Sequence, residues 1–289
     1  MSVRASLPRP VKIAGRRASV RLGTATAERR QLPSFIMVGA QRCGTTSLFR
    51  ALMSHPLIHS ANYHKGVNYF DVNYDRPFSW YQGHFPTTSV LRRRVKGTDG
   101  DPVTFEASGY YLFHPCAPER IAHHLPDVKI VAMLRDPVER AYSAWKHELA
   151  RGYETEPFED ALDLEDQRLE GVVERMEADP DVQSFSHRHH AYVRRGHYAE
   201  QLQRMQRYLP AEQFHVVDSE SFFTEPESTY GALLDFLGMP AAMPEKFDRW
   251  NGRPSSPMPE ETRSRLRAHF ADHDEALAAM IGRTPAWLT

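Results

Sequence analysis

The chain is poor in cysteine, has no long hydrophobic run and carries almost no net charge. Its 289 residues include two cysteines, Cys43 and Cys116. We therefore expect neither a disulfide framework nor a cysteine-based zinc site, and a reducing cytoplasm fits best. No stretch is hydrophobic over the roughly 20 residues of a membrane-spanning helix, and the N-terminal region lacks the hydrophobic core of a signal peptide. The net charge of −1 gives no support to a role in binding nucleic acid.

Basic residues are concentrated at the start of the chain. Residues 1–30 contain eight lysines or arginines, and Glu28 is the one acidic residue among them. We expect residues 1–32 to form a disordered basic arm and residues 33–289 to form one domain, for which a hydrophobic content of 41% supplies a core. Contact with a membrane surface or an acidic partner, and an arginine-rich transit peptide, are the alternatives for the arm.

Hydrophobic runs typical of strands alternate with helical patterns along the chain. This alternation favours an α/β fold with a central, mostly parallel sheet flanked by helices. Strands are expected at 34–39, 103–106, 129–134 and 214–217. Helices are expected at 45–54, 137–149, 198–208, 226–237 and 259–281, with a polar helical excursion over 157–178. Between the first two strands, residues 59–102 are expected to be rich in loops and carry many aromatic side chains.

The first expected strand runs directly into a tight loop and a helix. Gly39 and Gly44 have the spacing of a phosphate-binding P-loop, and the hydroxyl residues Thr45, Thr46 and Ser47 follow. Amide N–H groups at the start of a helix bind anions because they lack a partner within the helix and because the helix dipole adds positive potential. Gly44 also lets the loop approach a phosphate closely. We therefore expect this loop to hold a nucleotide phosphate.

The lysine of an ATPase or kinase loop is absent. Thr45 stands where that lysine would follow the second glycine, and Arg42 places a cation inside the loop. Asp136 is the nearest match to the acidic residue that holds Mg²⁺ in such enzymes, and it resembles a helix cap. We expect phosphate binding without a required metal, with Arg42 beside the bridging oxygen of the bond that breaks. Cys43 lies beside this cation, which could lower its pKa, but a small filler residue is the favoured interpretation.

A second anion site is expected after the strand at 129–134. Arg135 lies at the carboxyl end of that strand, where α/β sheets bind ligands. Asp136 can cap the next helix and Pro137 can begin it. Ser143 follows about two helical turns later, so a guanidinium with paired donors and a hydroxyl are available for one further phosphate. An ordinary helix start with a surface arginine is the alternative interpretation.

Together these two sites resemble those of the sulfotransferases that use 3′-phosphoadenosine 5′-phosphosulfate (PAPS), in particular the heparan sulfate and bacterial carbohydrate type. The resemblance covers about 33–289. It continues through the segments Tyr69-Phe70-Asp71, Asn73-Tyr74, Trp80-Tyr81, Glu106…Tyr110, Arg195-Gly196-His197-Tyr198 and Asn251-Gly252-Arg253. It implies a P-loop-like fold and transfer of a sulfuryl group from PAPS to a hydroxyl or an amine, with no metal required.

The resemblance also implies roles for individual residues on the donor side. The residues that would hold the 5′-phosphosulfate are Arg42, Cys43, Gly44, Thr45, Thr46 and Ser47. Arg42 would also stabilise charge on the leaving phosphate, as in other group transfers with a loose transition state. Arg135 and Ser143 would select the 3′-phosphate. The loop Asn251, Gly252 and Arg253 would close over the nucleotide.

The acceptor side departs from that family's pattern. Its members usually carry a Lys-Glu pair, in which the glutamate deprotonates the acceptor. Here Lys65 fits, but Gly66 stands in place of the glutamate. We expect Lys65 and His64 to be catalytic, with His64 as the replacement base, and Glu106 and His114 as the alternatives. An amine or an acidic phenol as the acceptor would need less help from a base.

Other classes of function and the identity of the acceptor stay open. A P-loop kinase or NTPase is one alternative, and a nucleotide-binding protein without catalysis, motivated by Gly66, is another. The acceptor is expected to be a carbohydrate, a glycolipid or a small metabolite, which the aromatic segment 63–85 could stack on. Fifteen histidines include His123-His124 and the group His187, His189 and His190. Their spacing, without nearby acidic residues, favours surface positions, so no metal site is expected.

Overall fold

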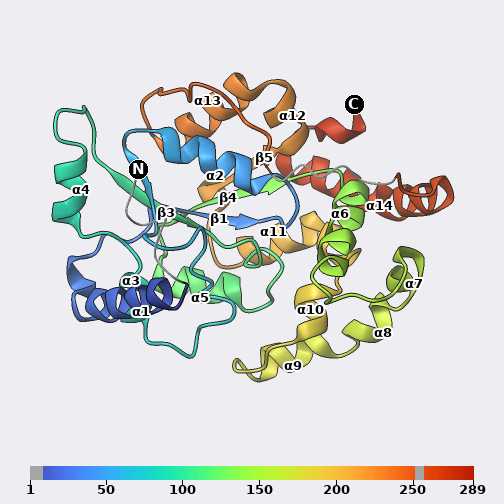
Figure 1. Cartoon of the computed structure of the whole chain (residues 1–289). Coiled ribbons are helices and arrows are strands. Elements are labelled where there is room, and N and C mark those ends of the chain that lie inside the picture. The colour runs from blue at the N-terminus through green and yellow to red at the C-terminus, as the bar shows by residue number, and fades with distance from the viewer. Residues whose placement is uncertain (1–8, 251–256) are drawn as a thin grey trace.

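The computed structural model describes residues 9–250 and 257–289, and its centre is a parallel sheet of five strands (Figure 1). The strand order is β2-β3-β1-β4-β5, and each adjacent pair is parallel. The strands are β1 (Phe35–Gly39), β2 (Ile58–Ser60), β3 (Val103–Ala107), β4 (Lys129–Leu134) and β5 (Phe214–Asp218). The expected fold class is confirmed, and the four expected strands correspond to β1, β3, β4 and β5. The sequence analysis missed β2, which has three residues.

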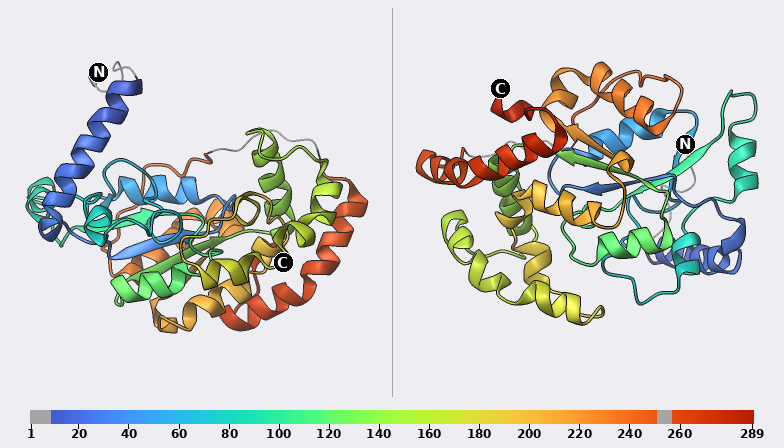
Figure 2. Two further views of the ribbon diagram at one scale, coloured as in Figure 1. Left: turned by 90° about the horizontal axis from the view of Figure 1, so that it is seen from below. Right: turned by 180° about the vertical axis from the view of Figure 1, so that it is seen from behind.

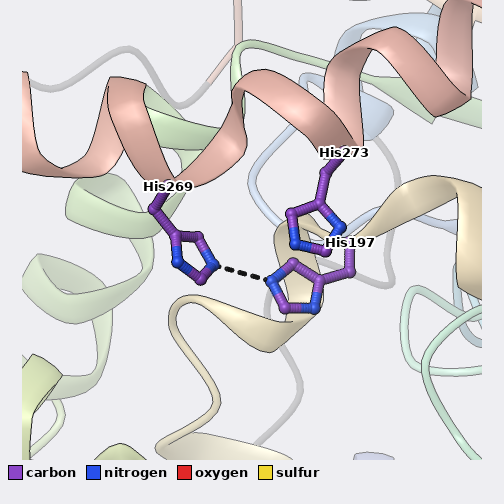
Figure 3. A group of neighbouring side chains, drawn as sticks. All are labelled: His197, His269 and His273. Carbon is purple, nitrogen blue, oxygen red and sulfur yellow. Dashed lines mark hydrogen bonds between the residues drawn. The ribbon is translucent and has the colours of Figure 1, made fainter.

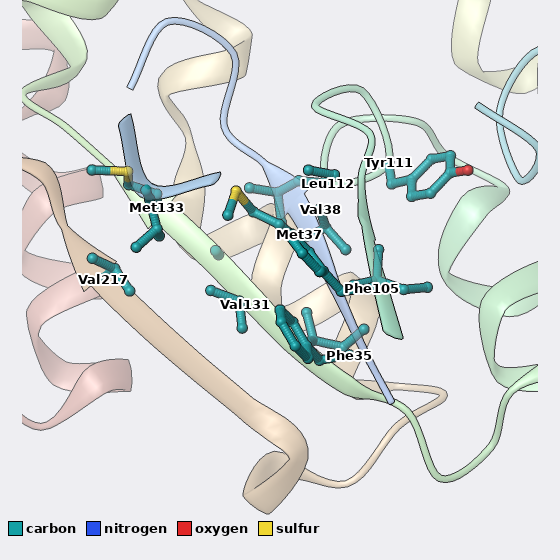
Figure 4. Packing of buried hydrophobic residues seen from close by; sticks show 14 of the residues in the cluster. Phe35, Met37, Val38, Phe105, Tyr111, Leu112, Val131, Met133 and Val217 are labelled. Atoms are coloured by element: carbon teal, nitrogen blue, oxygen red, sulfur yellow. The ribbon is translucent and has the colours of Figure 1, made fainter. Parts of the chain in front are cut away.

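Hydrophobic residues run without interruption through the two central strands because both faces of the sheet are covered. Every residue of β1 is buried, and so is β4 after its first residue. Phe35 of β1 stacks on Phe105 of β3 with ring centroids 4.8 Å apart. Met37 and Val131 belong to the same buried cluster (Figure 4). This continuous pattern is what made the central strands predictable.

Helices cover both faces of the sheet. α2 and α13 lie on one face and α5 and α11 on the other, while α6 and α14 pack together beside the sheet (Figure 1). These six helices are α2 (Thr45–Ser54), α5 (Ala117–His124), α6 (Pro137–Leu149), α11 (Tyr198–Gln206), α13 (Pro226–Leu237) and α14 (Glu260–Ile281). All five helices predicted from the sequence are present, and α5 is an addition. A short helix, α12 (Ser219–Thr224), links β5 to α13.

The polar excursion after α6 is helical, as expected. It consists of short helices that lie beside the main body (Figure 1): α7 (Phe158–Asp163), α8 (Glu165–Leu169), α9 (Val172–Ala178) and α10 (Phe185–His189). None of the helices in the described ranges combines the length and the apolar character needed to cross a membrane.

The N-terminal segment differs from the expected disordered arm. Residues Arg9–Ala25 form helix α1, whose start stands away from the body and whose end packs on α3 (Phe78–Gln82) (Figure 2). The crossing is so close that a Cβ on Gly23 would lie 2.3 Å from the carbonyl oxygen of Gly83. Arg30 then donates a hydrogen bond of 2.6 Å to the carbonyl of Phe85. Tight packing against the aromatic segment orders this part of the chain. The amino-acid composition of residues 1–32 gives no sign of this packing, so disorder was predicted instead.

The aromatic segment also differs from the expectation of a loop that offers its rings to an acceptor. Within 59–102 the structure contains most of β2, all of α3 and a further helix, α4 (Thr88–Arg94). Four of its aromatic side chains, Tyr69, Phe70, Tyr81 and Phe85, are at most 2% exposed. Tyr69 and Phe70 pack edge to face with ring centroids 5.1 Å apart. Burial of this much apolar area stabilises the fold, so these rings are core and are not available to a ligand.

Candidate functional site

The expected anion-binding residues lie at the carboxyl ends of β1 and β4. The loop after Gly39 leads from β1 into α2, and Arg135 directly follows β4. From β1 the chain continues toward β2 and β3 on one side of the sheet, and from β4 it continues to β5 on the other. In open parallel sheets, ligands bind at such a reversal of strand order, because the connecting loops separate there and leave a crevice.

The loop between β1 and α2 has a backbone shape that depends on glycine. Gly44 lies in the left-handed region, with φ of 86°, immediately before the first turn of α2. A Cβ at this position would lie 3.0 Å from the ring of Phe223 and 3.2 Å from the side chain of Met133. The glycine therefore lets α2 begin close to the end of β4. Within the first turn, the N–H of Ser47 donates to the carbonyl of Gly44 at 2.8 Å, which leaves the N–H groups of Thr45 and Thr46 at the helix start to face an anion.

The loop is anchored to α6, which carries Ser143 of the second expected anion site, and to the turn that carries Arg195. The Nε of Arg42 donates a 3.0 Å hydrogen bond to the hydroxyl of Ser143 on α6. The side-chain oxygen of Gln41 accepts a 2.8 Å hydrogen bond from Arg195, and its amide donates to Glu148 at 3.3 Å. Two residues expected in separate phosphate sites, Arg42 and Ser143, are therefore in direct contact. Gln41 is an anchor that the sequence analysis missed.

Lys65 brings a second cation to the loop. Its Nζ donates hydrogen bonds to the hydroxyls of Thr45 at 2.8 Å and Thr46 at 3.4 Å. Burial lowers the pKa of Lys65 to about 8. The lysine missing after Gly44 is thus replaced in space by one from the segment before β3. Lys65 was predicted from the sequence to belong to the site, and these two hydrogen bonds connect it to the start of α2.

Further cations gather around α6. Arg135 lies 3.7 Å from Glu139 and 4.0 Å from Glu220, both of which are partly exposed. Burial is the main cause that lowers the pKa of Lys146; the carboxylate of Glu139 opposes this shift, and the positive charges of Arg135 and Arg42 add to it. The three cations therefore lie near enough to repel one another, with Glu139 and Glu220 among them, and an anion bound there would relieve that repulsion. Lys146 was not predicted, because nothing in the sequence separates it from an ordinary surface lysine.

The hydroxyl of Ser47 contacts the end of the described segment before α14. It accepts a 2.9 Å hydrogen bond from the N–H of Trp250, and the guanidinium of Arg50 lies 4.9 Å from the Trp250 ring. The expected nucleotide-covering residues Asn251, Gly252 and Arg253 lie outside the described residues.

Cys43 is a buried filler residue. It has no exposed surface, and its sulfur lies 3.7 Å from the hydroxyl of Tyr198. Burial raises the pKa of the Cys43 thiol to about 11, so the alternative of a lowered pKa is wrong. Because its side chain is inaccessible, a contribution to ligand binding is restricted to its backbone. Both Cys43 and Cys116 are free thiols.

Gly66 has no room for the carboxylate that is missing from this position. A Cβ there would lie 2.5 Å from both the carbonyl oxygen of Ala107 and the hydroxyl of Ser108. The N–H of Ala107 also donates to the carbonyl of Lys65 at 2.8 Å. The backbone at residues 65 and 66 therefore runs directly against the end of β3, and a larger residue would push it away.

Glu106 is excluded as the base by its surroundings. It has no exposed surface. Its oxygens accept hydrogen bonds from the N–H of Val67 at 2.7 Å and from three hydroxyls, those of Ser108, Tyr111 and Tyr81, at 2.7, 3.0 and 3.1 Å. Burial raises the pKa of Glu106, and these bonds oppose the rise. The carboxyl group therefore fixes the segment that carries Lys65, and a ligand cannot reach it.

His114 and His187 differ from the expected surface positions, whereas His123 is exposed as expected. His114 is 3% exposed, and burial lowers its pKa to about 3, so it is not the base. His187 is buried and stacks on Phe113 with ring centroids 4.2 Å apart. His189 lies 3.1 Å from the carboxylate of Glu148.

His64 is the candidate base that remains accessible. Its side chain is exposed to solvent. The buried part of the ring lowers its pKa below the usual value, and the positive charge of Arg16 lowers it further. It opens on a pocket of about 640 Å³ between α1 and the aromatic segment. The lining residues are Arg16, Val20, Arg21, Thr24, His64, Asn73, Arg76, Trp80 and His84. The basic N-terminal segment thus supplies one wall of a pocket that begins one residue from Lys65.

Comparisons with known proteins agree with this geometry. The chain is 27% identical over 289 residues to bifunctional heparan sulfate N-deacetylase/N-sulfotransferase 4 of Mus musculus, covering 89% of this chain and 31% of that protein. It is 27% identical over 291 residues to heparan sulfate glucosamine 3-O-sulfotransferase 6 of Mus musculus, covering 90% of this chain and 75% of that protein. The chain therefore spans about a third of the length of the first of these relatives.

A solved structure and a family model complete the comparison. The crystal structure of a sulfotransferase from Alicyclobacillus acidocaldarius superposes with a TM-score of 0.63 and 30% identity, covering 87% of this chain and 96% of that one. The model of the sulfotransferase domain matches residues 32–252, which include both anion sites, Lys65 and His64. The chain belongs to the sulfotransferase domain family.

Proposed function

We propose that the protein transfers a sulfuryl group from PAPS to a hydroxyl or an amine of a carbohydrate, a glycolipid or a small metabolite. The observation that carries this proposal is the convergence of four cations, Arg42, Lys65, Arg135 and Lys146, on the carboxyl ends of β1 and β4. A nucleotide with phosphates at both its 5′ and 3′ ends needs positive charge at two places. Family membership supports the reaction class.

On the donor side, the two halves of the site have distinct roles. The first turn of α2 and Lys65 hold the 5′-phosphosulfate, and Arg42 and Lys65 stabilise the negative charge that develops on the leaving phosphate oxygen. Arg135 and Ser143 bind the 3′-phosphate, as Arg-phosphate pairs with an added hydroxyl do elsewhere. Asn251, Gly252 and Arg253 are assigned to the nucleotide by resemblance alone. The donor geometry uses charged side chains and backbone N–H groups throughout.

On the acceptor side, His64 accepts the proton of the attacking hydroxyl. It is the accessible titratable group next to Lys65, and its lowered pKa keeps it neutral and able to accept a proton at pH 7. The pocket that it borders contains Arg16, Arg21 and Arg76 together with the indole of Trp80. Arginines pair with carboxylates or sulfates, and an indole stacks on a sugar ring. This chemistry favours an acidic carbohydrate as the acceptor.

The kinase or NTPase alternative finds less support in the site. Asp136 accepts a 2.8 Å hydrogen bond from the N–H of Val138 and caps α6, so its carboxylate already serves the helix. A nucleotide-binding protein without catalytic activity would have the same donor site as the proposed enzyme. Turnover separates that alternative from the proposal.

The donor assignment is tested by calorimetry with adenosine 3′,5′-bisphosphate, the product of transfer. Arg135→Ala is expected to weaken its binding at least tenfold, because a charge-assisted contact to phosphate is lost. Arg93→Ala, which removes an exposed arginine of α4, is the matched control. Equal affinities in the two variants would contradict the assignment, and tighter binding of Mg-ATP than of the bisphosphate would favour a kinase.

Transfer itself is tested with sulfur-labelled PAPS and a panel of acceptors. Acidic oligosaccharides, neutral sugars, glycolipids and phenols are offered in parallel, and labelled product is separated from PAPS by chromatography. The proposal expects label on a carbohydrate, with a preference for acidic ones. Tight binding of PAPS with no labelled product from any class of acceptor would leave the binding protein as the correct interpretation.

A further inference from the structure

Three histidines from distant parts of the chain meet on the surface away from the donor loop. His269 and His273 lie one turn apart on α14, and His197 lies between the turn η3 (Arg194–Gly196) and α11 (Figure 3). One ligand nitrogen from each ring lies within 4.8 Å of the other two. The Nε2 atoms of His197 and His269 are 2.9 Å apart and share a hydrogen bond. Three imidazoles are thus gathered within reach of one point.

An acidic residue lies beside two of these rings and is placed to orient them when a metal binds. The Oε1 atom of Glu200 on α11 lies 3.5 Å from the Nδ1 of His197 and 3.5 Å from the Nδ1 of His273. A carboxylate that accepts from Nδ1 holds the proton on that nitrogen and leaves Nε2 free to bind a metal, the usual arrangement behind metal-binding histidines. No acidic partner for the histidines was predicted from the sequence; in the folded chain Glu200 takes that place.

We propose that His197, His269 and His273 bind one transition-metal ion, of the class of Zn²⁺, through their Nε2 atoms. Three nitrogen ligands with a water in the fourth position is an established coordination for Zn²⁺. With Zn–N bonds of about 2.0–2.1 Å in a tetrahedral site, the nitrogens lie about 3.3 Å apart. The present separations are compatible with this value after small movements. The rings of His197 and His273 stack at 3.7 Å with an angle of 7°, so one of them turns about its side-chain bonds to share the ion.

The ion would fasten α14 to the part of the chain that supports the donor loop. Gly196 packs so closely on α14 that a Cβ would lie 2.5 Å from the ring of Phe270. On either side of Gly196 and His197, Arg195 donates to Gln41 at 2.8 Å and Tyr198 donates to the carbonyl of Arg135 at 2.9 Å. A metal at His197 therefore holds together α14 and the segment that contacts both anion sites. The role is structural, because its ligands come from α14 and from the residue before α11, and the loop after Gly39 contributes none of them.

The experiment measures metal binding by the full chain without a polyhistidine tag and without nucleotide. Metal-free protein is dialysed against Zn²⁺, and the bound metal is counted by mass spectrometry. We expect one Zn²⁺ per chain, a higher melting temperature with Zn²⁺, and visible Co²⁺ absorption bands of a tetrahedral site when Co²⁺ replaces it. The double variant His269→Ala/His273→Ala is expected to lose at least 100-fold in affinity. Glu200→Gln is expected to lose about tenfold, as orienting residues do.

The matched control is His123→Ala, which removes an exposed histidine from α5 and is expected to leave Zn²⁺ binding unchanged. Circular dichroism confirms that each variant is folded, and Co²⁺ spectra of His269→Ala alone test the site if the double variant does not fold. Absence of stoichiometric Zn²⁺ in the wild type, or equal affinity in wild type and double variant, would overturn the proposal. Because no nucleotide is used, neither outcome bears on the sulfuryl-transfer proposal.

Discussion

Lys65 combines a cost in stability with a role at the loop. Its pKa of about 8, against the usual 10.5, results from burial. The unfolded chain therefore holds this proton more tightly, and stability rises with pH between about 8 and 10.5 because in that range the folded chain has lost the proton that the unfolded chain still binds. Below pH 8 the protein carries the full cost of the buried charge. A charge kept at such a cost belongs to a functional site more often than to a purely structural one.

Lys65→Met is expected to separate these two effects. The free energy of unfolding at pH 7 should rise, by up to about 3 kcal/mol from the pKa shift, while turnover falls at least 100-fold. Urea unfolding and initial rates at saturating acceptor measure the two quantities. Lys96→Met, at an exposed lysine, should change neither. Retention of full turnover in Lys65→Met would remove Lys65 from the catalytic group.

His64→Ala is expected to lower turnover by about 10²–10³, the usual contribution of a general base, with bisphosphate affinity unchanged within twofold. In the wild type, turnover should fall only at pH values below 6.5, because the lowered pKa keeps His64 neutral above that value. Initial rates across pH 5–9 and calorimetry supply both readouts, with His123→Ala as control. Near-normal turnover in the variant would exclude His64 as the base.

Gly66→Ala tests whether close packing excludes a side chain at this position. The added Cβ would lie 2.5 Å from the backbone of β3, so we expect a loss of about 1–3 kcal/mol in the free energy of unfolding, as for other overpacked sites. Gly109→Ala is the matched control, since a Cβ there has no neighbour within 4 Å. Equal stabilities in chemical denaturation would mean that a glutamate could have stood at residue 66.

At the scale of elements, helix α1 forms one wall of the pocket beside His64, which is the proposed acceptor site. It supplies Arg16 and Arg21 to the wall facing His64, and the hydroxyl of Ser19 contacts that of Tyr63 in the segment opposite. The approach of Gly23 to Gly83 sets the position of the whole helix. Displacement of α1 should therefore affect the acceptor without affecting the nucleotide.

Gly23→Ala and Gly15→Ala form a matched pair for this expectation. Both changes favour the helix by a similar amount, but only the Gly23 methyl meets the backbone of Gly83, whereas Gly15 has no neighbour within 4 Å. Gly23→Ala should raise the acceptor KM several-fold and speed tryptic cleavage within α1. Gly15→Ala should do neither, and identical behaviour of the two variants would contradict the assigned role of the crossing.

Much of the sheet and its main helices could be predicted from the sequence because the signals are local. Continuous hydrophobic runs marked β1 and β4, and Asp136 with Pro137 marked the start of α6. The expected loop after β1 and the placement of Lys65 beside it also agree with the structure. What failed depends on distant contacts. The order of α1 requires Gly83, the burial of Glu106 requires three hydroxyls, and His197 lies 72 residues before His269 in the sequence.

At the scale of the whole molecule, positive potential is local, because the net charge is −1. The affinity for the bisphosphate should therefore decline with ionic strength through screening of the site cations alone. We expect the Kd to rise several-fold between 50 and 500 mM salt, roughly the range over which the Debye length falls from about 14 to 4 Å. Arg135→Ala should show a shallower dependence. An affinity independent of salt would contradict a site built from these cations.

The hydrogen bond between Arg42 and Ser143 has a consequence for the selectivity of the proposed nucleotide site. Each side chain already satisfies the other before a ligand arrives. On the proposed assignment, a ligand with a single phosphate would break this bond and replace only one of its two partners. A ligand with phosphates at both ends replaces both partners at once. If the proposed assignments hold, the Arg42–Ser143 bond thus favours a bisphosphate over mononucleotides such as AMP, a preference that already exists in the empty protein.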